Sequence, residues 1–489
     1  MSARSETGNL AAYVSRIGLA LDEFLRARNG DPLTRHADWS SALDGPLPVI
    51  GVGGERVIAE LEHTVIPNGT RLSEPGFWSW ITAGPSTIPV VASLAATVAS
   101  PQRYTITAFN RLEELSLAWL AELCGLPEHM KGVYSSGGSV ANLLALGAAR
   151  QWAFEQGGLD PAANGMASTS VALYASAEAH HTVQRAAAVL GLGRRSVRRI
   201  ATDDRQRLDT AALERALLAD VAAGILPVAV IATAGTTNTG AIDPLRGAGE
   251  LARAHGVWFH VDGAYGLPGI LDERLEGLYD GLELADSAIV DPHKWLGAPV
   301  GIAATFVRDR SILHRAFTQE PAAYLEGGFV DAADVRVSLD SMGVPYADFG
   351  VELSAPARGA VVWSILRELG REGVRERVRH DNDLARHLAA NVRASDRLEL
   401  LAEPVLSICC LRYHPDTVGD LDSFNAALFR RLLRETPYLP SSTVINGSFA
   451  IRPCFINVRT ALEHVEGFCD AVVRIGDELA LATPMPAPI

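Results

Sequence analysis

The central part of the chain alternates short apolar runs with longer helical patterns, and this alternation constrains the fold more than any other feature. Each run is apolar throughout, which is typical of strands that a parallel sheet buries on both faces. The candidate strands are SVALYAS (170–176), LPVAVIAT (226–233), GVWFHV (256–261), SAIV (287–290) and GIAATFV (301–307). We therefore predict an α/β domain with a mostly parallel central sheet, in which a ligand would bind beyond the carboxyl ends of the strands.

The segments on either side of this region have different patterns. The N-terminal part is mainly helical in pattern and begins with an amphipathic helix over about residues 8–28. Toward the other end, the strand-like VLSICCLRY and SFAIRPCFINVRT lie around the helical LDSFNAALFRRLLRE. We predict three parts: an N-terminal helical segment (1–90), a large α/β domain (91–374) and a small α+β domain (375–489).

Composition narrows the class of protein. A formal net charge of −14 argues against nucleic acid or an anionic membrane as the default partner. No stretch approaches the ~18 uninterrupted apolar residues of a membrane span, and the N-terminus lacks the continuous apolar segment of a secretory signal. The five cysteines show no C-x-x-C pair and no metal-ligand spacing. We therefore expect a cytoplasmic protein with free thiols and no metal site.

Lysine usage singles out one position. Of the 43 lysine and arginine residues, only Lys131 and Lys294 are lysine, and Lys294 lies in DPHKWLG directly after the apolar run SAIV. An amine can lose its proton and act as a nucleophile, whereas a guanidinium stays charged in proteins. Lys294 is therefore either a chemically active amine or a surface lysine whose stem covers apolar sequence.

Polar residues of particular kinds follow the other predicted strands. Gly137, Gly138 and Ser139 begin a helix, where free N–H groups suit an anion, although Ser139 could equally be a simple N-cap. Asp262 ends an apolar run, where an unpaired carboxylate costs several kcal/mol. The remaining loops carry His180, His181, Thr236 and Thr237, each of which alone is as consistent with a polar turn.

These loops lie on one edge of the predicted sheet, and their combination is more specific than any one of them. Pyridoxal 5′-phosphate needs N–H donors for its phosphate and a carboxylate for its pyridine nitrogen. It also needs a flat group on one ring face, a small group on the other, and an amine for its aldehyde. The loops supply all of these groups, so we predict this cofactor.

With these motifs in view, the chain resembles the group II pyridoxal-phosphate-dependent amino-acid decarboxylases, the family of aromatic-L-amino-acid and glutamate decarboxylases. The resemblance rests on SGGSVANLLAL, AHHTV, AGTTNTGAIDPL, HVDGAYG and DPHKWLG, which follow the family's order. Similarity continues into LSICCLRY and FAIRPCFINVRT, so it covers about residues 60–475. It implies fold type I, the aspartate-aminotransferase-like architecture, and a homodimer with active sites at the interface.

The resemblance also implies a role for individual residues. The predicted catalytic residues are Lys294 as the Schiff-base lysine, Asp262 as the partner of the pyridine nitrogen, His180 as the stacking imidazole, and Tyr346 as the loop acid that protonates the product carbon. The predicted cofactor contacts also include Gly138, Ser139 and His293 at the phosphate, Ala264 against the second ring face, and Thr237 near the ring substituents. In PGFWSWITAG (75–84), Trp78, Trp80 and Thr82 are the predicted substrate-binding residues.

The substrate and the outcome stay open at this point. Aromatic residues in PGFWSWITAG favour decarboxylation of an aromatic or bulky apolar L-amino acid to the amine and CO2, although aromatic residues are often simple core packing. An acidic substrate held by an arginine is the first alternative, and an oxidative decarboxylation to an aldehyde is the second. A cofactor-binding protein without turnover is the third, and the presence of Lys294, Asp262 and His180 counts against it.

Overall fold

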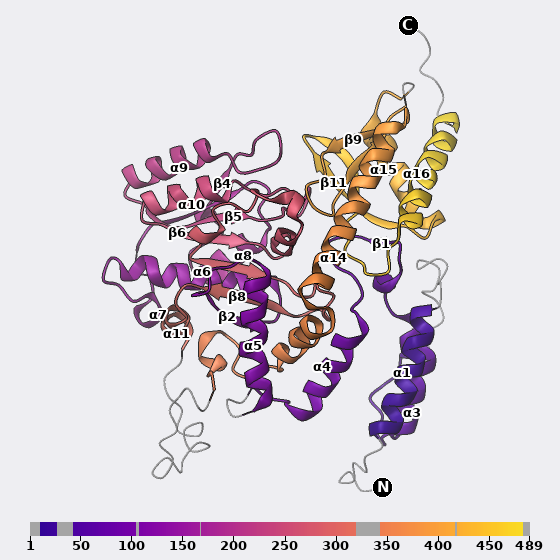
Figure 1. Cartoon of the computed structure of the whole chain (residues 1–489), viewed down its shortest axis with the longest axis horizontal. Coiled ribbons are helices and arrows are strands. Elements are labelled where there is room, and N and C mark those ends of the chain that lie inside the picture. Colours follow the sequence, from indigo (N-terminus) through magenta and orange to yellow (C-terminus); the bar gives the residue numbers. More distant parts are fainter. Residues whose placement is uncertain are drawn as a thin grey trace.

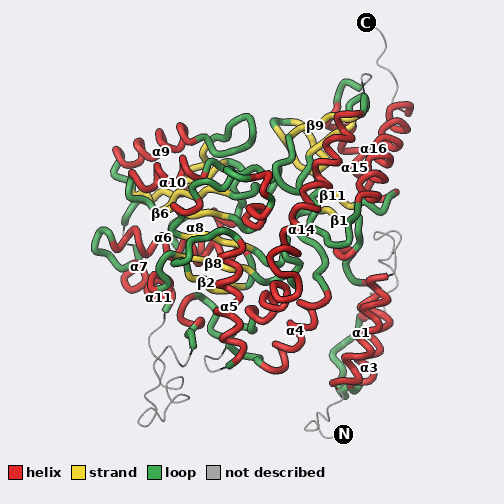
Figure 2. The backbone as a smooth tube through the Cα atoms, in the orientation of Figure 1, coloured by secondary structure: helices red, strands yellow, loops and turns green. Residues whose placement is uncertain are grey.

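A computed structural model gives the fold and describes residues 10–26, 43–103, 107–166, 168–318, 343–415 and 418–482. The described residues form two separate β-sheets with helices packed around each (Figures 1 and 2). The larger sheet carries the loops that the sequence singled out. The smaller sheet lies at the other end of the long helix α14.

The large sheet has seven strands in the order β2-β8-β7-β6-β5-β3-β4. The strands are β2 (Lys131–Ser135), β3 (Val171–Ser176), β4 (Val197–Ile200), β5 (Leu226–Thr233), β6 (Trp258–Asp262), β7 (Ser287–Val290) and β8 (Ala303–Val307). Strand β8 runs antiparallel to both of its neighbours, and all other neighbours pair in parallel. Every residue of β3, β6, β7 and β8 is buried, as expected for continuously apolar runs. The predicted mostly parallel sheet is confirmed.

Helices that follow these strands pack on the sheet. Helix α6 (Gly138–Glu155) contacts the four strands β5 to β8, while α10 (Leu245–Ala254) packs on β5 and β6. Among the residues that the structure describes, the other α-helices before the long helix α14 are α1 (Leu10–Arg26), α3 (Gly54–Glu60), α4 (Thr87–Ala99), α5 (Ala108–Leu123), α7 (Pro161–Asn164), α8 (Thr182–Val189), α9 (Thr210–Ala222) and α11 (Ser311–Phe317). The predicted amphipathic helix near the N-terminus is therefore present as α1.

The small sheet has five strands in the order β1-β11-β12-β10-β9. They are β1 (Phe77–Trp78), β9 (Leu398–Ala402), β10 (Cys410–Tyr413), β11 (Leu439–Ile445) and β12 (Ser448–Arg452), covered by α15 (Leu421–Glu435) and α16 (Leu462–Ala482). Strand β1 comes from the N-terminal part of the chain and pairs in parallel with β11. A segment that precedes the large domain in sequence thus forms one edge of the small sheet.

Helix α14 (Arg358–Ala394) joins the two halves of the molecule (Figure 1). It packs on α4 and α5 near its start and on β9 and α16 near its end, and it bends at Gly370, whose φ is 62°. The helix crosses the division expected at residues 374 and 375. We therefore propose the parts 1–90, 91–374 and 375–489 only as an approximate division. No helix in the described ranges has the length and apolar character needed to cross a bilayer.

Candidate active site

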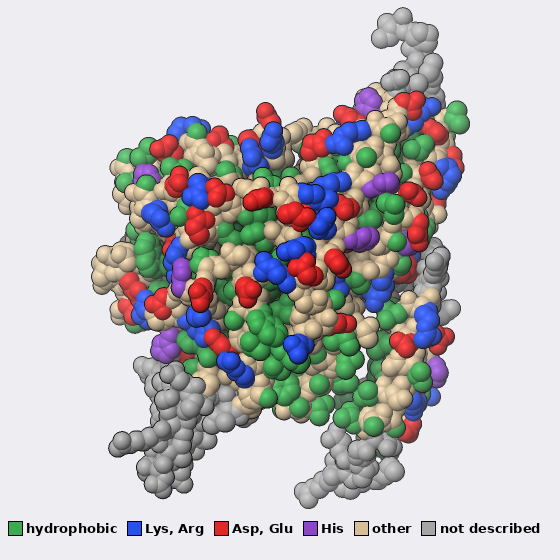
Figure 3. Space-filling model, viewed as in Figure 1, with side chains coloured by type: hydrophobic (Ala, Val, Ile, Leu, Met, Phe, Trp, Pro, Cys, Tyr) green, Lys and Arg blue, Asp and Glu red, His purple; other side chains and the backbone are tan. Residues whose placement is uncertain are grey.

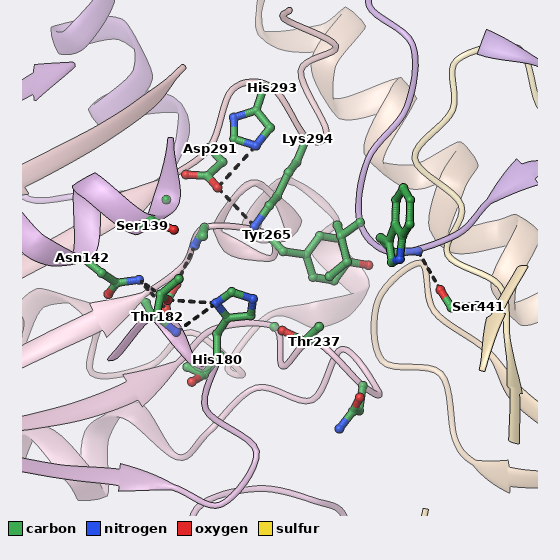
Figure 4. Close-up of a pocket in the computed structure, with 18 of the residues that line it drawn as sticks. Ser139, Asn142, His180, Thr182, Thr237, Tyr265, Asp291, His293, Lys294 and Ser441 are labelled. Atoms are coloured by element: carbon green, nitrogen blue, oxygen red, sulfur yellow. Dashed lines mark hydrogen bonds and ion pairs between the residues drawn. The ribbon is translucent and has the colours of Figure 1, made fainter. Parts of the chain in front are cut away.

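The carboxyl ends of the parallel strands open into a cavity of about 460 Å³ (Figure 4). It is lined by nine of the predicted site residues: Trp80, Gly138, Ser139, His180, Thr237, Asp262, Ala264, His293 and Lys294. Figure 4 shows Lys294 and His180 directed toward a common space, with Ser441 of the small sheet across from them. The cavity therefore combines loops of the large sheet with one wall from the small sheet.

Lys294 lies in the short loop after β7. Its Nζ is 3.2 Å from Oδ2 of Asp291, and Nε2 of His293 is 3.7 Å from the same oxygen. Nδ1 of His293 donates to the carbonyl oxygen of Ile302 (2.7 Å), so the imidazole is held from the side of β8. The amine is thus oriented by a buried carboxylate, while its side chain keeps some contact with the cavity (19% exposed).

The residue after the lysine fixes this loop from behind. Nε1 of Trp295 donates to Oδ2 of Asp381 on α14 (2.8 Å), and the indole stacks on the ring of Tyr265 at 5.0 Å between centroids. Burial raises the pKa of Asp381 well above its usual range. Helix α14 therefore holds the lysine loop in place, although it lies outside the cavity.

The loop between β2 and α6 forms the predicted anion cradle. Gly137 has a φ of 123°, a conformation that favours glycine. The N–H groups of Gly138 and Ser139 are the first two of α6 and precede the bonds that Val140 and Ala141 make to the Gly137 carbonyl oxygen. A Cβ added at Gly138 would lie 2.7 Å from Oδ2 of Asp291, so no side chain fits there. Oδ1 of Asp291 is buried with no hydrogen-bond partner among the described residues. Backbone N–H groups at the start of a helix, with no side chain in the way, are the environment in which the phosphate of a ligand could be bound.

Asp262 ends β6 and is buried at the floor of the cavity. Its Oδ2 accepts a hydrogen bond from Nδ2 of Asn142 (3.1 Å), and its Oδ1 accepts one from the backbone N–H of Ala264 (3.2 Å). A Cβ at Gly263 would lie 2.6 Å from Cβ of Leu267, so the backbone after Asp262 passes close to Leu267. These two hydrogen bonds fix the orientation of the Asp262 side chain.

His180 lies between β3 and α8, and its ring partners fix its tautomer. Nδ1 of His180 is 2.8 Å from Oγ1 of Thr182 and also accepts from the Thr182 N–H (3.4 Å). Burial lowers the pKa of His180, although the charge of Asp262 opposes this shift. The imidazole is thus neutral near pH 7 and carries its proton on Nε2. Its flat ring lines the same cavity as Ala264.

The small-sheet wall holds residues that the sequence did not single out. Nε of Arg452 donates to the carbonyl oxygen of Asn238 (3.2 Å), Nη1 to that of Trp80 (2.6 Å), and Nη2 to that of Thr237. The backbone N–H of Trp80 donates to Oγ of Ser441 (2.6 Å). Trp80 has a φ of 56°, unusual for a bulky residue, and the residue is 66% exposed. Residues from distant parts of the chain therefore hold Trp80 at the cavity mouth.

Three predicted residues do not line this cavity. Trp78 is fully buried in the small-sheet core, where Nε1 donates to Oγ1 of Thr460 (3.0 Å), so its prediction as a substrate contact is wrong. Thr82 is half-buried and does not line the cavity. Tyr346 is buried beside α5, and its hydroxyl donates to Glu114. Within one chain, Tyr346 therefore does not reach the cavity from this position.

The donor set fits pyridoxal 5′-phosphate better than a metal ion. Within the described ranges, no three His, Cys, Asp or Glu side chains gather in a way that could hold a metal. The cavity instead gathers a backbone cradle at the start of α6, a lone amine, the hydrogen-bonded carboxyl group of Asp262 and a neutral imidazole. These are the groups that the cofactor requires.

Comparisons with known proteins agree with this geometry. Residues 42–414 match the family described as the pyridoxal-dependent decarboxylase conserved domain. The chain is 28% identical over 448 residues to the aromatic-L-amino-acid decarboxylase of Bacillus atrophaeus, covering 90% of this chain and 89% of the relative. It is 30% identical over 416 residues to the cysteine sulfinic acid decarboxylase of Mus musculus, covering 84% and 81%.

A solved structure, that of Oryza sativa TDC with PLP and tryptamine, superposes with a TM-score of 0.87 and 25% identity, covering 98% of this chain and all of the other. These matches confirm the predicted fold type and the predicted cofactor. The chain therefore belongs to the pyridoxal-dependent decarboxylases and is a pyridoxal-phosphate-dependent carboxy-lyase.

Proposed function

We propose that the enzyme decarboxylates an L-amino acid with an aromatic or bulky apolar side chain and releases the amine and CO2. The observation that carries this proposal is the small-sheet wall of the cavity. Trp80 and Ile81 line it, whereas Arg452, the one arginine on the described lining, directs all three nitrogen positions at backbone carbonyls. An acidic side chain would need an uncommitted cation there.

The cofactor contacts follow from the chemistry of the lining. Pyridoxal 5′-phosphate, when bound, supplies an aldehyde that takes up amines and a ring that accepts the electrons left by departing CO2. Gly138, Ser139 and His293 would hold its phosphate, Asp262 would pair with its ring nitrogen, and Lys294 would bind its aldehyde. These assignments are supported by the positions of the five residues around one cavity.

The protein side chains supply the remaining functions. His180, neutral through burial, can lie flat on the ring without adding a positive charge. Asp291 can hold the Lys294 ammonium when that amine is released, because its Oδ2 lies 3.2 Å from Nζ. Ala264 and Thr237 remain proposed contacts on the same lining. Tyr346 remains the proposed acid, and it would have to act from a second subunit or after leaving Glu114.

The substrate class can be tested with purified holoenzyme. Release of CO2 would be measured with tryptophan, tyrosine and phenylalanine and, in parallel, with glutamate, aspartate and cysteine sulfinate. We expect turnover of the aromatic set and formation of the amine. Preference for an acidic substrate would contradict the proposed side-chain class, and one peroxide and one aldehyde per CO2 would contradict simple decarboxylation.

We further propose a cytoplasmic homodimer with sites at the interface. Apolar side chains are exposed along α4, namely Ile88, Val90, Val91, Leu94 and Val98, and Figure 3 shows apolar side chains gathered over this part of the surface. The five cysteines are free and buried, which suits a reducing compartment. Light scattering after gel filtration should give twice the chain mass, and Leu94→Glu should shift it toward the monomer.

A further inference from the structure

A chain of buried hydrogen bonds leads from the indole of Trp258, at the start of β6, to Asp262 at its end, and the function proposed above does not use it. Nε1 of Trp258 donates to Oγ of Ser287 (2.8 Å), which lies 2.9 Å from Nδ1 of His260. Nε2 of His260 is 3.1 Å from Oδ1 of Asn142. Nδ2 of Asn142 then donates to Oδ2 of Asp262 (3.1 Å). Each of these five residues is at most 5% exposed, so solvent is almost excluded from the chain.

The direction of donation along this chain is fixed by its two ends. The indole N–H of Trp258 can only donate to Ser287, and the carboxylate of Asp262 can only accept from the NH2 group of Asn142. The amide oxygen of Asn142 therefore accepts from Nε2 of His260, and Nδ1 of His260 is left to accept from Ser287. A neutral His260 that accepts at Nδ1 carries its proton on Nε2.

This direction of donation requires His260 to be neutral. Burial lowers the pKa of His260 to about 4, so the ring is uncharged at neutral pH and only one nitrogen can donate. If the amide of Asn142 were flipped, its oxygen would face the Asp262 carboxylate and its NH2 would face the His260 N–H. Both contacts would be repulsive, so one amide orientation is selected.

Asn142 also reaches the second cofactor-facing group. Its Nδ2 lies 3.2 Å from Oγ1 of Thr182, which leaves the Thr182 hydroxyl proton free to donate to Nδ1 of His180 (2.8 Å). Figure 4 shows Asn142, Thr182 and His180 side by side beneath the cavity. One amide on α6 therefore orders both the carboxylate and the imidazole that face the predicted ring position.

We propose that Asn142 is a positioning residue: its amide keeps Asp262 as an oriented carboxylate toward the cofactor's ring nitrogen and holds His180 in the tautomer protonated on Nε2. Trp258, Ser287 and His260 act through it by setting the orientation of that amide. The proposal rests on the proposed contact between Asp262 and the ring nitrogen, and it does not depend on which amino acid is the substrate.

The test uses holoenzyme reconstituted with cofactor labelled with ¹⁵N at the ring nitrogen. Asn142→Asp keeps the shape of the side chain but removes the donor to Asp262. We expect the ring-nitrogen resonance to move from the protonated toward the neutral position and the cofactor dissociation constant to rise about tenfold or more. Asn425→Asp is the matched control, because Asn425 is also fully buried and hydrogen-bonded but lies in the small domain. It should leave both measurements unchanged.

A second pair of variants covers the case in which Asn142→Asp does not fold. His260→Gln keeps an N–H donor near the position of Nε2, whereas His260→Leu removes it. We expect a ring-nitrogen resonance near that of the wild type in His260→Gln and a shift toward neutral in His260→Leu. A wild-type resonance in folded Asn142→Asp, or in His260→Leu, would overturn the proposal. A neutral ring nitrogen in the wild type would instead contradict the proposed contact between Asp262 and the ring nitrogen. Failure to release CO2 from aromatic substrates would contradict only the proposed substrate class.

Discussion

Two regions meet at the cavity but are built differently: the rim of the large sheet, meaning the loops that carry Ser139, His180, Asp262 and Lys294, and the segment of residues 77–82. On the rim, each functional side chain follows the end of a strand and has a polar partner, as Asp262 has Asn142 and Lys294 has Asp291. In segment 77–82, two tryptophans stand two residues apart and have opposite environments: Trp78 is fully buried and Trp80 is 66% exposed. On the rim, the type of side chain indicates its function. In segment 77–82, the environment in the folded protein determines which tryptophan packs in a core and which lines the cavity.

The largest effect should come from the rim. Lys294→Ala removes the only amine on the described cavity lining, so we expect activity to fall by about a thousandfold or more and the visible absorbance of bound cofactor to be lost. Lys131→Ala is the matched control, because Lys131 is the only other lysine in the chain and is exposed on β2. Unchanged absorbance in Lys294→Ala would mean that the cofactor is bound through another group.

The next largest effect should be on stability, in the segment. Trp78 packs between Tyr438, Phe455 and Phe468, and its indole N–H donates to Thr460. Trp78→Ala should therefore lower the free energy of unfolding by about 3–5 kcal/mol, measured by urea denaturation. If Trp78 contacted substrate instead, the variant would retain its stability and change mainly its KM.

The contrast between Lys294 and Trp78 shows which parts of the site the sequence could predict and which it could not. Lys294, Asp262 and His180 were predictable because strand-helix alternation places their loops on one edge, and because each carries a side chain that the cofactor needs. Trp78 was misassigned because an aromatic residue in a short motif does not reveal which core receives it. Only the pairing of β1 with β11, more than 350 residues away, places Trp78 in the small-sheet core.

Other omissions have similar physical causes. Asn142 occupies an inward position of a mostly apolar helix, so its sequence context indicates only core packing. Arg452 and Ser441 lie in the small domain, and tertiary packing alone brings them to the cavity. Strand β4 was not predicted because its sequence, VRRI, contains two arginines and forms the edge of the sheet, where the continuous apolar pattern is not needed.

The next prediction concerns His260, which supports Asp262 of the rim through Asn142. Its burial should make the free energy of unfolding depend on pH. The pKa of His260 is about 4 in the folded protein, below the ordinary value of about 6.5 that applies when the chain is unfolded. The unfolded state therefore binds a proton that the folded state excludes as the pH falls through this range. This one group should remove about 2 kcal/mol of unfolding free energy between pH 7 and pH 5. Urea titrations at both pH values should show a loss smaller by this amount in His260→Gln, and equal losses in both proteins would contradict a buried neutral imidazole.

The smallest effect on stability, and the sharpest contrast with Trp78, should come from Trp80. Glycine accepts the φ of 56° at this position without strain, and the backbone N–H that donates to Ser441 is kept. Trp80→Gly should therefore change the free energy of unfolding by no more than about 1 kcal/mol, while KM for an aromatic substrate rises about tenfold. Asn446→Gly is the matched control, because Asn446 also has a positive φ (49°) but lies between β11 and β12, outside the cavity lining. A stability loss in Trp80→Gly as large as that of Trp78→Ala, with KM unchanged, would mean that both tryptophans are packing residues.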